Sequence, residues 1–141
     1  MRSLILPILA ATLASCAPAK PDIAVSDAWA RATAPGQSNA AIYATIANTG
    51  AADQLVGVAT GAGMAMLHAN ESKGGVARMR MVAAVPIPAQ GRVSLTPGGT
   101  HVMLTGLKAP LAAGTQFPMT MRFAASGERT VEVSVVAAGE R

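Results

Sequence analysis

Aromatic and charged residues are scarce in this chain of 141 residues, at 3% and 13%. Nucleic-acid-binding surfaces need aromatic side chains for base stacking or clustered basic residues for phosphates, so we expect no nucleic-acid partner. Apolar residues make up 51% of the chain, which is enough to fill a core and excludes intrinsic disorder. The length suits one folded domain.

Cysteine is almost absent as well, since Cys16 is the only one. A single cysteine excludes a disulfide framework within the chain and a metal site made of cysteines alone. The sequence also lacks paired carboxylates, a nucleophile elbow and a phosphate-binding loop, and its two histidines are the only candidate general bases. We therefore expect that the protein is not an enzyme.

The first 16 residues have the layout of an export signal. Arg2 supplies a positive charge, an apolar stretch runs from Leu4 to Leu13, and small residues precede Cys16. The apolar stretch is far shorter than the ~20 residues that cross a membrane. Residues 1–15 are therefore predicted to be a signal peptide. An ordinary secretory signal cleaved nearby and a membrane anchor are the alternatives.

The segment Leu13-Ala14-Ser15-Cys16 resembles the bacterial lipobox, in which the chain is cut just before an acylated cysteine. The resemblance implies lipidation of Cys16, and residues 16–22 would then tether a domain over residues 23–141. Such a protein is expected in the periplasm, bound to the membrane by a lipid anchor. Ala17 stands where an acidic residue would resemble an inner-membrane retention signal, which slightly favours the outer membrane.

From Ile23 onward, short segments alternate between apolar and polar residues, and Gly, Pro, Asn and Asp separate them. No segment keeps a 3.6-residue period over three turns, which argues against helices. The pattern is typical of an all-β domain, either a β-sandwich or a Greek-key barrel. The sequence predicts strands over residues 25–30, 40–48, 55–59, 64–69, 76–82, 92–95, 101–107, 119–123 and 130–136.

Eight methionines against two histidines are the unusual feature of the composition. His101 and Met103 are two residues apart, so on a strand both side chains leave the same face. His68 and Met79 precede them in the spacing His-x10-Met-x21-His-x-Met. Thioethers are neutral, soft ligands that bind Cu(I) well and Zn(II), Mg(II) or Ca(II) poorly, and imidazole adds a stronger donor. This set of residues therefore indicates Cu(I) as the metal.

The alternative is that these residues only pack. A single methionine on a strand is usually core filling, and a single histidine is usually a surface or hydrogen-bonded side chain. A role as reserve donors is open to Met64, Met66 and Met81, although core or rim packing is favoured for them. Met119 and Met121 alternate with polar residues in a strong strand pattern and are expected in the core.

The spacing of the four residues is similar to the signature of the periplasmic copper A chaperone family, PCuAC-like Cu(I) carriers that feed the CuA site of cytochrome c oxidase. Segments 27–31, 39–48 and 97–107 also resemble family segments, and the resemblance covers residues 25–136. It implies a cupredoxin-like β-barrel with His68, Met79, His101 and Met103 as Cu(I) ligands. It also implies delivery of copper, by ligand exchange, to cytochrome c oxidase subunit II or another assembly factor.

The sequence departs from the family pattern in places. Ala69-Asn70 follows His68 where relatives often have Glu and a further donor, and the chain stops at Arg141 without a tail rich in His and Met. One copper per domain is therefore expected. A lipid anchor on Cys16 is also less usual than a soluble carrier. Trp29 is expected to pack in or against the barrel rather than cover the copper.

Two other functions stay open on the sequence. A copper buffer or resistance protein would use the same ligands without a dedicated acceptor. A metal-free β-sandwich interaction module would leave the His and Met spacing as a coincidence. An electron-transfer cupredoxin is disfavoured, because blue-copper sites need a cysteine ligand inside the barrel and Cys16 lies in the leader.

Overall fold

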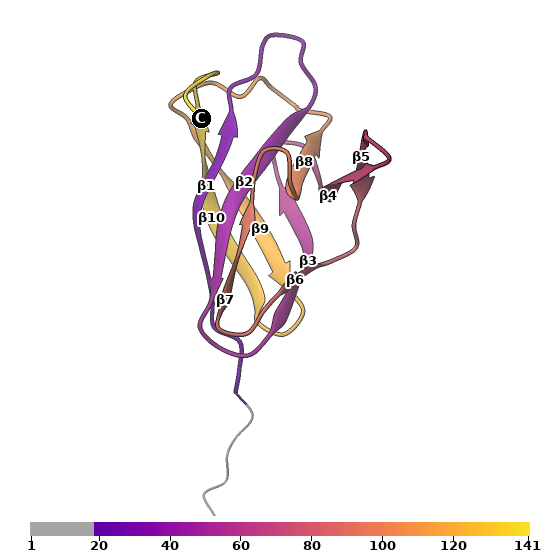
Figure 1. The fold of residues 1–141 in the computed structure, drawn as a ribbon. Coiled ribbons are helices and arrows are strands. Elements are labelled where there is room, and N and C mark those ends of the chain that lie inside the picture. The colour runs from indigo at the N-terminus through magenta and orange to yellow at the C-terminus, as the bar shows by residue number, and fades with distance from the viewer. Residues whose placement is uncertain (1–18) are drawn as a thin grey trace, which may run out of the picture.

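The computed structural model describes residues 19–141, and in this part of the chain all regular structure is β-strand (Figure 1). The described part contains no helix with the length and hydropathy of a membrane span. The strands, in chain order, are β1 (Ile23–Arg31), β2 (Ala40–Asn48), β3 (Asp53–Thr60), β4 (Met64–Lys73), β5 (Val76–Met81), β6 (Val85–Ile87), β7 (Gly91–Leu95), β8 (His101–Thr105), β9 (Gln116–Phe123) and β10 (Gly127–Val136).

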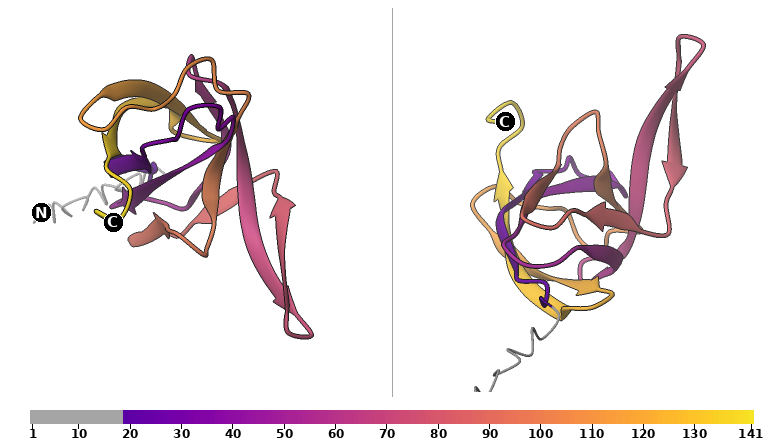
Figure 2. Two further views of the ribbon diagram at one scale, coloured as in Figure 1. Left: turned by 90° about the horizontal axis from the view of Figure 1, so that it is seen from above. Right: turned by 60° about the horizontal axis from the view of Figure 1, so that its bottom comes forward.

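The ten strands form one sheet in the order β5-β4-β8-β2-β1-β10-β9-β3-β6, and β7 pairs with the second half of β2. All pairs are antiparallel except β1 with β10. The sheet curls around its own apolar face, while the β4–β5 hairpin projects from the body (Figure 2). The path of paired strands is open, because its end strands β5 and β6 are not paired with each other.

The all-β prediction is confirmed, and each of the nine predicted segments coincides with a strand. The strand that sequence analysis missed is β6, which has three residues and carries Pro86 at its centre. Proline cannot donate a ladder hydrogen bond, so a short segment containing it does not read as a strand. The signal peptide predicted for residues 1–15 and the lipidated Cys16 lie outside the described residues.

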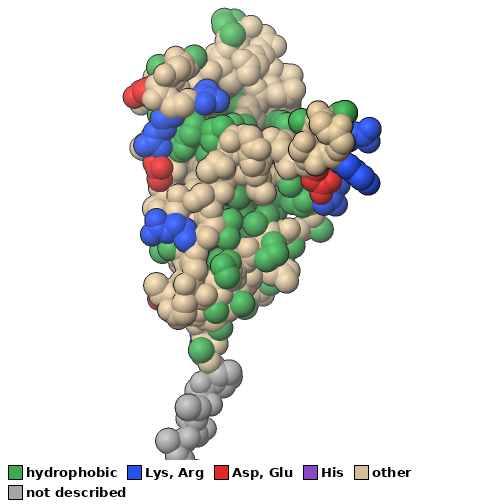
Figure 3. Space-filling view, viewed as in Figure 1, with side chains coloured by type: hydrophobic (Ala, Val, Ile, Leu, Met, Phe, Trp, Pro, Cys, Tyr) green, Lys and Arg blue, Asp and Glu red, His purple; other side chains and the backbone are tan. Residues whose placement is uncertain are grey.

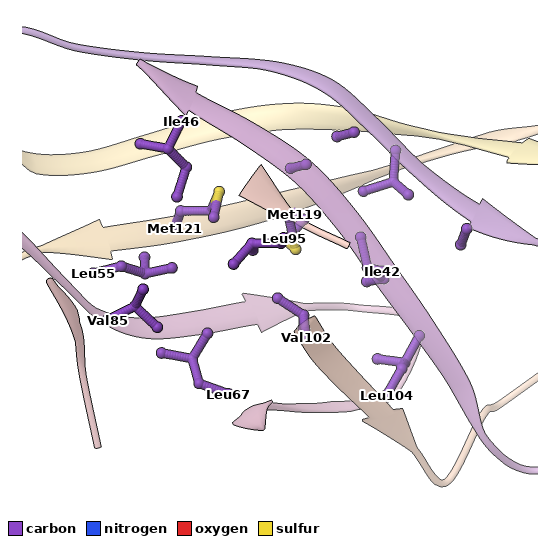
Figure 4. Close-up of a cluster of buried hydrophobic side chains, with 14 of the residues drawn as sticks. Ile42, Ile46, Leu55, Leu67, Val85, Leu95, Val102, Leu104, Met119 and Met121 are labelled. Atoms are coloured by element: carbon purple, nitrogen blue, oxygen red, sulfur yellow. The ribbon is translucent and has the colours of Figure 1, made fainter. Parts of the chain in front are cut away.

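The core forms because alternate residues of each strand point to the inside of the curled sheet (Figure 4). On β2 the inward residues are Ile42, Ala44 and Ile46, all buried. Met119 and Met121 of β9 have no exposed surface, as predicted from their alternation with polar residues. Each buried side chain of this size contributes about 1.5–3 kcal/mol by leaving water.

The N-terminal end of the described chain is held on the turn between β2 and β3. The Ala51 amide donates to the Lys20 carbonyl oxygen (3.1 Å), and the Asp22 amide donates to Asn48 Oδ1 (3.1 Å). Gly50 allows this close approach, because a Cβ at that position would lie 2.0 Å from the Lys20 carbonyl oxygen. The last residues of the predicted tether therefore dock on the sheet, at the end of the molecule away from β4 and β5 (Figure 1).

Asp53 is a buried carboxylate that holds the β9–β10 turn against the start of β3. Oδ1 accepts hydrogen bonds from the amides of Gln54 (2.8 Å) and Ala125 (2.9 Å), and Oδ2 accepts from the amide (3.0 Å) and hydroxyl of Ser126. Burial alone would raise the pKa of Asp53. The hydrogen bonds, led by that of the Ser126 hydroxyl, outweigh burial and hold the pKa below its usual value.

We expect Asp53→Asn to lower the free energy of unfolding by about 2–3 kcal/mol at pH 7, because an amide nitrogen would face donors that now bind a carboxylate. Since folding lowers the pKa of Asp53, its contribution is complete above the pKa of an unfolded aspartate. That contribution is lost as the pH falls through the folded-state pKa. Urea unfolding at a series of pH values measures both effects. A variant as stable as the parent at pH 7 would contradict this role.

Candidate metal centre

The two histidines lie directly opposite each other on neighbouring strands. In the antiparallel β4–β8 pair, His68 is the partner of His101. Their ring centroids are 6.1 Å apart, with 62° between the ring planes. The strand neighbours Leu67 and Val102 point into the core, so alternation turns both imidazoles to the outer face of the sheet. Residues 33 positions apart in the sequence are thus brought into one site.

A backbone hydrogen bond fixes the ring of His101. His101 is buried, and its Nδ1 lies 2.9 Å from the carbonyl oxygen of Gly99. A carbonyl can only accept, so neutral His101 carries its proton on Nδ1 and leaves the Nε2 lone pair free. A backbone carbonyl on the second ring nitrogen is the usual support of a metal-binding histidine.

His68 has a nitrogen without a hydrogen-bond partner. Its Nδ1 is buried, and among residues 19–141 no donor or acceptor pairs with it. An unpaired buried polar atom costs about 1–3 kcal/mol, and native structures contain few of them. A metal ion bound by the imidazole is one way to satisfy the group, so this atom fits the predicted ligand role.

Met103 and Met79 lie on the same outer face, on either side of the histidine pair. On β8, Met103 is two residues from His101 and pairs with Met66 of β4. On β5, Met79 pairs with Asn70 and is therefore two residue pairs farther toward the hairpin tip than His68. The structure thus brings the histidines together and places the two predicted thioether ligands at diagonal positions around them.

The position directly opposite His68 on β5 belongs to Met81. The register follows from the hairpin turn, since Lys73 pairs with Val76 and only Gly74 and Gly75 stand between them. Both glycines have positive φ, at 61° and 78°, as a two-residue hairpin turn requires. Sequence analysis did not count back from these two glycines, and the count would have found Met81.

Five methionines share this outer face of β4, β5 and β8, and we refer to them as the methionine face: Met64, Met66, Met79, Met81 and Met103. Core or rim packing is favoured for three of them from the sequence, and the core alternative is wrong for Met64 and Met81, whose exposed fractions are 66% and 65%. Met66 is half-buried. Met64 and Met81 both lie on the outer face of the sheet, and Met81 also belongs to the hairpin that projects from the body (Figure 2).

An aromatic row continues the histidine pair toward β1. The ring centroids of Tyr43 and His101 are 6.3 Å apart, and those of Trp29 and Tyr43 are 4.6 Å apart. A bulge in β1 at Asp27, with φ of +51°, brings Trp29 rather than Ala28 opposite Tyr43. Trp29 is buried against the sheet, as predicted, and Tyr43 separates it from the histidines. Sequence analysis missed the position of Tyr43 behind His101.

The chemistry of this donor set is soft and uncharged. Two imidazoles and five thioethers share one face of β4, β5 and β8, and such ligands favour Cu(I) over hard divalent ions. Within residues 19–141, no three His, Cys, Asp or Glu side chains are grouped so as to hold a metal ion. The histidines are therefore grouped with methionines, not with carboxylates.

Charged side chains occupy the other face of the projecting hairpin. Alternation places Glu71, Lys73, Arg78 and Arg80 opposite to Met79, and Arg80 forms an ion pair with Glu71 (2.5 Å). Figure 3 shows these basic groups around a carboxylate at the outer end of the hairpin. The hairpin thus has one basic face and one uncharged, sulfur-bearing face.

Solved structures of copper-related domains have this fold. The chain has a TM-score of 0.69 and 28% identity to the copper-bound PCuAC domain from PmoF2, covering 82% of this chain and 92% of that one. The apo PCuAC domain from PmoF1 gives 0.70 and 32%, with 82% and 93% covered. The solution structure of CuI-DR1885 from Deinococcus radiodurans gives 0.66 and 32%, with 90% and 84% covered. Fold and site together define a PCuAC-type domain, which confirms the resemblance found in the sequence.

A family model described as "Putative lipoprotein LpqE-like" matches residues 23–135, and the chain belongs to this LpqE-like family. A curated relative, "Putative lipoprotein Lxx21020" of Leifsonia xyli subsp. xyli, is 37% identical over 116 residues. The match covers 80% of this chain and 69% of that protein.

In the metal-free protein with neutral imidazoles, we expect His101 to be the Nδ1–H tautomer, because Nδ1 donates to the Gly99 carbonyl. Two-bond proton–nitrogen correlation spectra of the nitrogen-15-labelled chain report the tautomer directly. The His101→Ala variant assigns the signals. A proton on Nε2 with a bare Nδ1 would contradict the geometry described above.

Proposed function

We propose that this protein is a Cu(I)-binding metallochaperone of the cell envelope. The observation that carries the proposal is the cross-strand pair of His68 and His101. His68 has a buried Nδ1 without a hydrogen-bond partner, and the hydrogen bond of His101 to the Gly99 carbonyl fixes its tautomer. In our proposal His68, His101, Met79 and Met103 bind one Cu(I). The names of the copper-bound PmoF2 domain and of CuI-DR1885 support this choice of metal.

The proposed ligands differ in how firmly the fold holds them, and that difference suits transfer. His101 is buried on the central strand β8, whereas Met79 is 50% exposed on the edge strand β5. An exposed thioether can leave Cu(I) and be replaced by a ligand from another protein while the histidines still hold the ion. Such ligand exchange is non-catalytic, and the site contains no further general base, in line with a carrier rather than an enzyme.

We expect the full-length chain, purified in mild detergent, to bind one equivalent of Cu(I) in anaerobic competition with a chromophoric Cu(I) chelator. The His68→Ala, His101→Ala double variant should lose this binding, because it lacks both strong donors. Circular dichroism checks that the variant keeps its β-sheet. If the parent chain fails to compete for Cu(I), the chaperone proposal is wrong and a metal-free interaction module becomes the better interpretation.

The finer proposal is that the copper goes to the CuA site of cytochrome c oxidase, in subunit II or through another assembly factor. The same loaded chain, mixed with an apo CuA domain, should pass on its copper and produce the CuA spectrum after oxidation. A copper buffer or resistance protein would bind Cu(I) as well but would keep it in this mixture. The transfer experiment therefore separates the two functions, which share the same ligands.

We further propose that residues 1–15 are a signal peptide, that Cys16 is lipidated and that residues 16–22 tether a cupredoxin-like copper domain over residues 23–141 in the periplasm. The lipoprotein names of the family and of the Leifsonia relative support an envelope anchor. The sequence slightly favours the outer membrane, because Ala17 follows the cysteine.

Cells grown with a clickable fatty acid should label the parent chain and leave Cys16→Ser unlabelled, because the thiol is the proposed acylation site. The variant should also move from the membrane fraction to the soluble periplasmic fraction, or stay as an uncleaved precursor. His101→Ala serves as the control, since it changes the metal centre and leaves the lipobox intact. Equal labelling of parent and Cys16→Ser would refute lipidation at this residue.

A further inference from the structure

Met81 lies directly opposite His68 on β5, where a third ligand would be nearest to the two histidines. His101, His68 and Met81 form one straight row across β8, β4 and β5, each directly opposite the next. Directly opposite residues of an antiparallel pair have Cβ atoms about 4.5–5.5 Å apart, whereas diagonal residues are about 7–8 Å apart. Met79 is in the diagonal position to His68.

The spacing between the outer ligands favours Met81 in the same way. Met79 and Met103 are separated by two strand intervals and four residues along the strands, about 16 Å between Cα atoms in an untwisted sheet. Met81 and Met103 are separated by two intervals and two residues, about 12 Å. An ion held by the histidines and Met103 therefore meets Met81 before it meets Met79.

Exposure also sets Met81 apart from an ordinary packing residue. The large hydrophobic side chains that are exposed in residues 19–141 are Met64, Val76, Met79 and Met81. Three of the four are methionines of the methionine face, so packing does not explain them. The turn glycines Gly74 and Gly75 hold the hairpin register, so Met81 stays opposite His68 rather than sliding past it.

We propose that Met81 is a Cu(I) ligand of this protein and exchanges with Met79 at the ion held by His68 and His101. The inference rests on the proposed function. Two thioethers two residues apart on one face of an exposed edge strand give the ion a second sulfur to bind when the first one leaves. The exchange would replace one sulfur ligand by the other while both histidines hold the ion.

The test compares Met81→Leu, Met79→Leu and the double variant with Met64→Leu in the full-length chain. Leucine keeps the apolar volume and removes the sulfur. Met64 is a matched control, since it lies on the same face with an exposed fraction of 66% against 65%, but pairs with Thr105, four residue pairs from the histidines. The measurements are the Cu(I) dissociation constant by chelator competition and the copper–sulfur scattering in X-ray absorption spectra.

Each single variant, Met79→Leu and Met81→Leu, should raise the dissociation constant by about tenfold or less and retain copper–sulfur scattering, because the other thioether replaces the lost one. The double variant should be at least about tenfold weaker than either single variant, with less sulfur scattering. Met64→Leu should change the constant less than about twofold. Thermal unfolding checks the fold, and Met81→Gln is a second variant should leucine disturb it.

The inference is overturned when Met81→Leu equals the Met64→Leu control and the double variant equals Met79→Leu alone. In that outcome the parent still binds Cu(I), so the proposed function survives. A parent chain that binds no Cu(I) instead refutes the proposed function, and this inference with it.

Discussion

The β4–β8 register is the constraint on which the rest of the site depends. It pairs His68 with His101 and Met66 with Met103, while Leu67 and Val102 from the same strands enter the core. A slip of one residue would turn the imidazoles inward and the core residues outward, because side chains alternate with a period of two. The burial of apolar side chains therefore also sets the position of the metal donors. The core holds the site in place without supplying any ligand.

The predicted metal donors are less buried and less constrained the closer their strand lies to the β5 edge of the sheet. His101 sits on β8, which is paired on both sides, with its ring fixed by the Gly99 carbonyl. His68 lies one strand farther out, and Met79 and Met81 lie on β5, the exposed edge of the sheet. A carrier has to bind its ion and also release it. In the proposed site, a buried ligand at one end and exposed ligands at the other would serve both needs.

Sequence reasoning predicted the parts of the structure that follow from the alternation of apolar and polar residues and from the spacing of residues within one strand. Alternation in residues 40–48 and 130–136 gave the strands, and the two-residue step from His101 to Met103 gave their common face. Sequence reasoning could not predict which strands pair over long distances in the chain. It therefore predicted neither the open path of strands nor the position of Tyr43 next to His101. It also favoured core or rim packing for Met64 and Met81, and the core alternative fails because both side chains are exposed on the outer face of the sheet. The place of Met81 is a different case, because the Gly74-Gly75 turn contained that information.

The position of the site relative to the N-terminal end gives a reason for the projecting hairpin. The backbone around Lys20 and Asp22 is fixed on the β2–β3 turn, at the opposite end of the sheet from β5 (Figure 1). With the proposed lipid on Cys16, the docked Lys20 would follow the anchor by only four residues along the chain. The β4–β5 hairpin would then lie at the end of the domain away from the anchor (Figure 1). An anchored carrier could not tumble freely to meet its partner, and in our proposal the edge strand β5, which extends from the body and bears exposed thioethers, would present the ion outward.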